Sequence, residues 1–128
     1  MEVLICGSDI AVSKVERALE GLGARLRPVP GAIVNPDPER VQSVALKADV
    51  AILEIGQPAV RQAYCYWCRV WRLPIVLLIE SCDSDWAELV EMGANGFLCC
   101  RMPDREFASR LKAILRRQVP EVGWKVKY

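Results

Sequence analysis

Short apolar runs of strand length recur along the chain, separated by turn residues such as Gly, Pro, Asn and Asp. These runs occupy residues 3–6, 24–29, 50–54, 74–79 and 96–100. Continuous apolar runs of this length are typical of strands buried on both faces of a parallel sheet. The run at 24–29 alternates apolar and charged residues and ends in Pro30-Gly31, so we expect it near an edge of the sheet.

Segments with helical spacing of apolar residues follow each of these runs. The spacing predicts helices over about 12–22, 39–47, 59–71, 86–92 and 104–118. Ser8 or Asp9 can cap the first helix, Gly23 can end it, and Asp104 can cap the last one. Five strand–helix units predict an α/β fold. We expect a (βα)5 chain with a doubly wound, flavodoxin-like parallel sheet of strand order 2-1-3-4-5.

The length of 128 residues suits one domain, which we place at residues 1–118. Residues 119–128 contain Pro120 and Gly123, followed by alternating apolar and basic residues over 124–128. This composition indicates a tail, a linker or the start of a missing effector domain. No apolar run is long enough to cross a membrane, and no basic region precedes the first strand. We therefore expect a cytoplasmic protein without a membrane partner.

Composition narrows the possible chemistry. The net charge is +1, too near zero to indicate a nucleic-acid surface by itself. The chain has no histidine, which removes the commonest general base and the commonest metal ligand. No glycine-rich phosphate loop follows the first strand. We therefore expect no enzymatic activity, no bound metal and no cofactor.

Four segments, at residues 48–58, 73–78, 93–98 and 106–111, follow one another in a specific order and spacing. In this arrangement the chain resembles the receiver domain of two-component response regulators, over residues 3–118. The resemblance implies a receiver-like sheet and a role in signal transduction through a phosphorelay. It also implies a functional site at the carboxyl edge of the sheet, where open α/β sheets bind ligands.

The resemblance implies five polar groups at that edge. In the family, two acids after the first strand and a phosphoacceptor aspartate after the third hold Mg²⁺, an ion that prefers oxygen ligands. A hydroxyl after the fourth strand and a lysine after the fifth bind the phosphoryl group. In this chain the five positions are occupied by Cys6, Gly7, Glu54, Ile79 and Cys100.

None of the five family residues is kept, so the chain resembles a pseudo-receiver that lacks the phosphorylation residues. Glu54 either imitates the charge of the modified aspartate or is a solvated acid at a polar rim. Without a metal and a cation, the charge that develops in phosphoryl transfer has nothing to stabilise it. The aromatic switch position of the family is Phe97, which lacks the usual tyrosine hydroxyl.

The resemblance also implies an output face, formed by the fourth helix, the fifth strand and the fifth helix. Its charged residues offer the opposite charges that a two-fold homodimer requires, and they are Glu88, Glu91, Arg105, Glu106, Arg110, Lys112 and Arg116. We expect a homodimer, with a protein partner or an effector domain. Nucleic acid would be contacted only through a missing effector domain, and a role in transcriptional regulation would require such a domain. The other interpretation is a solvated helix face with pairs such as Glu106–Arg110.

The six cysteines leave a second function open, a thiol-based redox or metal sensor on the same fold. Cys65 and Cys68 form a CxxC motif within a predicted helix, where positions three apart share a face. Cys6, Cys82 and Cys100 lie near the carboxyl edge and could form a soft-metal site. The competing interpretation is that these thiols are buried and pack as small apolar groups.

Overall fold

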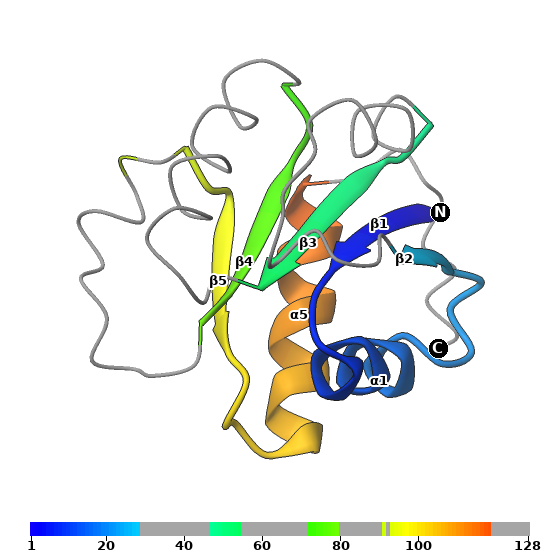
Figure 1. Ribbon diagram of the computed structural model, residues 1–128, viewed down its shortest axis with the longest axis vertical. Coiled ribbons are helices and arrows are strands. Elements are labelled where there is room, and N and C mark those ends of the chain that lie inside the picture. The colour runs from blue at the N-terminus through cyan, green and yellow to red at the C-terminus, as the bar shows by residue number, and fades with distance from the viewer. Residues whose placement is uncertain (29–46, 55–71, 80–90, 92, 119–128) are drawn as a thin grey trace.

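The computed structural model describes residues 1–28, 47–54, 72–79, 91 and 93–118. Within these residues the chain forms five strands and two long helices, which are β1 (Glu2–Cys6), α1 (Asp9–Ala18), β2 (Arg25–Pro28), β3 (Val50–Glu54), β4 (Ile75–Ile79), β5 (Gly96–Cys99) and α5 (Asp104–Gln118). All five strands pair in parallel, in the order β2-β1-β3-β4-β5 (Figure 1). The predicted sheet and its strand order are therefore confirmed.

The helices predicted over 39–47, 59–71 and 86–92 fall outside the described residues, except for Lys47 and Glu91. The predicted tail, 119–128, also lies outside them. No helix in the part of the chain that the structure describes is long and apolar enough to cross a membrane.

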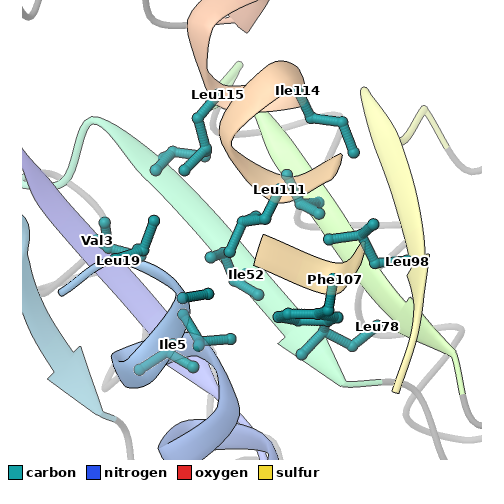
Figure 2. Packing of buried hydrophobic residues seen from close by; sticks show 14 of the residues in the cluster. Val3, Ile5, Leu19, Ile52, Leu78, Leu98, Phe107, Leu111, Ile114 and Leu115 are labelled. Atoms are coloured by element: carbon teal, nitrogen blue, oxygen red, sulfur yellow. The ribbon is translucent and has the colours of Figure 1, made fainter. Parts of the chain in front are cut away.

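Both faces of the sheet are buried, as the continuous apolar runs predicted. On one face α1 and α5 pack against the strands (Figure 1). Figure 2 shows Phe107, Leu111 and Leu115 of α5 among the side chains of Ile52 and Leu78, and all five are fully buried. Strand residues that point to the other face of the sheet are also fully buried, and these include Leu4, Cys6, Leu53 and Leu77.

Two polar side chains fix the start of neighbouring strands at the amino edge of the sheet. The carboxylate of Asp49, just before β3, accepts a hydrogen bond of 2.8 Å from the backbone N–H of Glu2 in β1. The amide oxygen of Asn95, just before β5, accepts one of 2.8 Å from the N–H of Ile75 in β4. Each side chain satisfies an end-of-strand donor and thereby helps to set the register.

The first helix begins and ends earlier than the apolar spacing predicted. Ser8 is its N-cap, the helix begins at Asp9, and it ends at Ala18. The predicted extension to position 22 is wrong. The backbone leaves the helix at Leu19 and passes through Gly21 and Gly23, whose φ angles are +80° and +69°. Glycine adopts this left-handed conformation without steric cost, so the two glycines favour the turn over another helical turn.

Two boundaries around β5 and α5 also differ from prediction. β5 ends at Cys99, so Cys100 lies in the following turn and not in the strand. Asp104 is the first residue of α5 and not its cap, because the N–H of Phe107 donates to the carbonyl of Pro103. The carboxylate of Asp104 instead forms ion pairs with Lys14 at 3.4 Å and Arg17 at 3.3 Å, which join α5 to α1.

Candidate functional site

The residues at the predicted pocket positions gather at the carboxyl edge of the sheet. Gly7 directly follows β1, Glu54 ends β3, Ile79 ends β4 and Cys100 directly follows β5. Because the strands are parallel and adjacent, these ends lie along one edge.

Glu54 is half-buried and is bound by a residue that the sequence analysis did not place in the site. The hydroxyl of Ser8 donates to Glu54 Oε2 at 3.1 Å. The same hydroxyl oxygen accepts a hydrogen bond of 3.3 Å from the N–H of Ala11, as an N-cap does. Ser8 therefore links the end of β3 to the start of α1. The sequence signal for Ser8 was its capping position, which did not reveal the bond to Glu54.

Gly7 lies in close contact with both Glu54 and α1. A Cβ atom at position 7 would be 3.2 Å from the Cβ of Ala11 and 3.5 Å from the Cβ of Glu54. A side chain here would thus stand directly beside the Glu54 carboxylate. Glycine supplies no side-chain ligand at this point, so the position offers neither a carboxylate nor a hydroxyl.

Cys6 is fully buried in the last position of β1, in register with Leu53. Strand alternation places Leu53, and with it Cys6, on the face opposite to that of Glu54. Burial in apolar surroundings raises the pKa of the Cys6 thiol to about 12. The thiol is therefore protonated at neutral pH, and a protonated thiol is neither a good metal ligand nor a nucleophile.

Ile79 and Cys100 occupy the positions where the resemblance implied a hydroxyl and a lysine. Ile79 is buried and apolar, and its carbonyl accepts a hydrogen bond of 2.8 Å from the N–H of Cys100. Cys100 is half-buried and packs against the core formed with α1 and α5. Cys99 is buried within β5, and Phe97 in the same strand is half-buried.

A cation does reach the β5–α5 turn, but it comes from α1. Lys14 Nζ donates to the carbonyl oxygens of Cys100 at 2.8 Å and of Met102 at 2.5 Å. It also lies 3.4 Å from Asp104 Oδ1 and 5.3 Å from the ring centroid of Phe107. Only 12% of the Lys14 side chain is exposed. The sequence analysis did not identify Lys14, because a lysine on an amphipathic helix usually reaches solvent.

The described side chains at the carboxyl edge do not fit a magnesium ion. Mg²⁺ prefers octahedral oxygen coordination with one or two carboxylates. Among the described residues the edge offers the Glu54 carboxylate, already bonded to Ser8 and beside a glycine, while the buried Cys6 thiol lies on the opposite face. Within the described part of the chain, no three His, Cys, Asp or Glu residues come together as metal ligands.

The remaining predicted residues divide between the described and the undescribed parts of the chain. Glu91 and Arg105 are exposed, and Arg110 Nη2 lies 3.1 Å from Glu106 Oε1 in an i,i+4 ion pair. The others lie outside the described residues, and they are Cys65, Cys68, Cys82 and Glu88. The CxxC interpretation therefore stays a prediction.

Comparisons with solved structures show which fold this arrangement is similar to. A pilus assembly-related protein of Burkholderia pseudomallei superposes with a TM-score of 0.71 at 15% identity, over 92% of this chain and 90% of that one. The Mn²⁺-bound response regulator Rcp1 superposes with a TM-score of 0.67 at 16% identity, over 98% of this chain and 99% of that one. A signal receiver domain from a histidine kinase of Syntrophus aciditrophicus superposes with a TM-score of 0.62 at 22% identity, over 99% of this chain and 97% of that one.

The chain is a receiver-like domain by fold. Neither protein-family models nor curated protein sequences match it. The receiver-like domain has the same five-stranded parallel architecture as these neighbours, and the match spans nearly their whole length. Its carboxyl edge holds one carboxylate bonded to a helix cap, beside a turn fastened by Lys14 of α1.

Proposed function

We propose that the chain is an atypical receiver that acts as a phosphorylation-independent module for signalling, dimerisation and protein interaction. It is not an enzyme, it is cytoplasmic, and it contacts nucleic acid only through an effector domain, in transcriptional regulation or a related process. The receiver-like fold supports a role in signalling. The carboxyl edge supports independence from phosphorylation.

The Ser8–Glu54 hydrogen bond is the observation that carries this proposal. Phosphoryl transfer relies on positioning and on cations that neutralise the developing charge. Glu54 instead has a neutral hydroxyl, a glycine and α1 as its described neighbours. The hydroxyl of Ser8 holds the Glu54 carboxylate in place at the end of β3.

Treatment with a small phosphodonor tests this directly. The protein is incubated with acetyl phosphate and Mg²⁺ or Mn²⁺, with a typical receiver domain as positive control, and its intact mass is measured. We expect no added phosphoryl group on the wild type. Because the missing groups are metal ligands, we expect the same for Glu54→Asp. Phosphorylation of the wild type would refute the proposal, and phosphorylation of Glu54→Asp alone would assign the loss to the acceptor residue.

The proposed homodimer uses the fourth helix, β5 and α5. The exposed Glu91 and the Glu106–Arg110 pair supply both signs of charge, as a two-fold contact requires. Light scattering over a range of protein concentrations should show a dimer. Arg110→Glu should weaken it by about tenfold, which is about 1.4 kcal/mol. Lys47→Glu makes the same charge change away from this face and should not. A monomer at all concentrations contradicts dimerisation.

A further inference from the structure

Positive charge is concentrated on α5. The helix carries five cations and two carboxylates between Asp104 and Gln118. The whole chain, in contrast, has a net charge of only +1. The remaining segments together are therefore slightly acidic, and the excess of positive charge lies on this one helix.

Both carboxylates of α5 are already engaged within the protein. Asp104 forms ion pairs with Lys14 and Arg17 of α1. Glu106 forms its ion pair with Arg110 on α5 itself. Four cations of α5 form no ion pair within the described part of the chain, and they are Arg105, Lys112, Arg116 and Arg117. These four cations are left uncompensated.

Three of the four uncompensated cations share one side of the helix. At about 100° per residue, Arg105, Ser109, Lys112 and Arg116 fall within a sector of about 60°. The basic stripe, as we call these four residues, extends about 16 Å along the helix. Arg105, Ser109 and Arg116 are exposed, and Lys112 is half-buried. A partly buried stem with a charged head directed outward is the usual arrangement of a lysine on such a face.

The basic stripe is separate from the ion pair on the output face. Glu106 and Arg110 are rotated by about 100° and 140° from Arg105 around the helix axis. Arg105, Lys112 and Arg116 were predicted to belong to the output face together with Arg110, but helical geometry separates these three from Arg110. Arg117 lies about 120° from Arg105, between Glu106 and Arg110, so one side of the helix carries both signs of charge while the basic stripe carries only cations and Ser109.

From this arrangement we propose that the basic stripe docks an acidic helix of a partner protein, an inference that rests on the proposed role as a protein-interaction module. Guanidinium groups bind carboxylates in a planar, bidentate geometry, and Ser109 adds a neutral donor between them. An acidic helix with carboxylates at i, i+4, i+7 and i+11 would present them at the same spacing as the stripe.

The overall charge favours a protein partner over nucleic acid. Arg and Lys both contact phosphates and read guanine, so the number of cations decides the partner. Nucleic-acid affinity grows with the number of phosphates that are neutralised, but the stripe holds three cations on a chain whose remaining segments together are slightly acidic. A short stripe of three cations suits the few carboxylates of one helix.

Two peptides of identical composition test the proposal by fluorescence anisotropy. One is an alanine-based helix with Glu at i, i+4, i+7 and i+11, and the other has the same residues in scrambled order. The wild type should bind the matched helix at least about fivefold more tightly than the scrambled one. Arg105→Glu and Arg116→Glu should each weaken that binding by about tenfold. Lys47→Glu, the matched single charge reversal in an exposed turn outside the stripe, should change it less than about twofold.

Three results would overturn the proposal: equal binding of both peptides, equal effects of Arg116→Glu and Lys47→Glu, or tighter binding of duplex DNA than of the matched helix at the same salt concentration. The assay contains no phosphodonor and needs no dimer. A failure to bind therefore leaves the proposed independence from phosphorylation untouched. Conversely, phosphorylation of the wild type would refute the proposed function without changing the peptide result.

Discussion

Lys14 Nζ, on the first helix, lies 2.8 Å from the carbonyl oxygen of Cys100, in the turn that leads from β5 to α5. The same ammonium group donates to Met102 O and faces the Asp104 carboxylate. Its three N–H donors thus have three oxygen partners, on a side chain that is mostly withdrawn from solvent. The turn that begins α5 is therefore held by α1 in addition to its own hydrogen bond of 3.2 Å from the N–H of Met102 to the carbonyl of Cys99.

Lys14→Met should destabilise the fold and loosen the β5–α5 turn. Hydrogen bonds from a charged donor contribute about 1.5–3 kcal/mol each, and methionine removes the two bonds of Lys14 while filling a similar volume. We expect a loss of about 2 kcal/mol in the free energy of unfolding, measured with urea. Hydrogen exchange should rise at the amides of Cys100, Met102 and Phe107. Lys112→Met, at a half-buried lysine that forms no ion pair within the described part of the chain, should change neither measurement, and a similar effect of both variants would contradict the role of Lys14.

Ser8 should be coupled energetically to Glu54. Ser8→Ala removes the N-cap of α1 and should cost about 1 kcal/mol of stability. Ser8→Asp keeps a good cap but sets a second carboxylate beside Glu54, so we expect it to be less stable than Ser8→Asn. In a Glu54→Gln background the difference between Asp and Asn should shrink, because the repulsion has gone. Additive free energies in this double-mutant cycle would show that the side chains at positions 8 and 54 do not interact.

Sequence patterns predicted the sheet well because its strands are nearly uniform apolar runs. Residues 50–53 and 75–79 leave little choice but a strand buried on both faces, and their order along the chain fixes the topology. The patterns failed where a turn competed with a helix. Leu19 and Leu22 fit the helical period, but Gly21 and Gly23 adopt left-handed conformations and end α1 earlier.

The site was only partly predictable, because its polar contacts join residues far apart in the chain. Glu54 was found from its place at the end of a buried run. The partners of Lys14 are backbone carbonyls 86 and 88 residues away, and a carbonyl has no signature in the sequence. Ser8 was recognised as a cap, but a cap motif does not reveal which neighbouring strand its hydroxyl faces.

Gly96 should tolerate no side chain, because α5 packs directly on it. A Cβ atom at this position would lie 2.7 Å from Cγ2 and 3.1 Å from Cδ1 of Ile114. Gly96→Ala should therefore destabilise the protein by about 1–3 kcal/mol through overpacking. Urea unfolding measures this cost, and in an Ile114→Ala background, which removes the clashing atoms, it should largely disappear. An equal cost in both backgrounds would assign the effect to the strand backbone and not to the contact.

Cys6 should make the stability of the protein fall in alkaline solution. Its pKa rises from 9.0 to about 12 on folding, because burial disfavours the thiolate. Between these values the unfolded chain releases a proton that the folded chain keeps, so stability decreases by about 1.4 kcal/mol per pH unit. Below pH 9 both states are protonated and the group has no effect on the pH dependence.

Urea unfolding at pH 7.5 and pH 10.5 checks this for the wild type, Cys6→Ala and Cys6→Val. The two variants differ in packing and should differ in stability at pH 7.5. Between the two pH values, however, both should lose about 2 kcal/mol less than the wild type, because neither has a thiol at position 6. Other groups that titrate in this range are common to all three proteins and cancel in the comparison. An equal loss in all three would mean that the Cys6 thiol ionises as readily in the folded protein as in the unfolded chain.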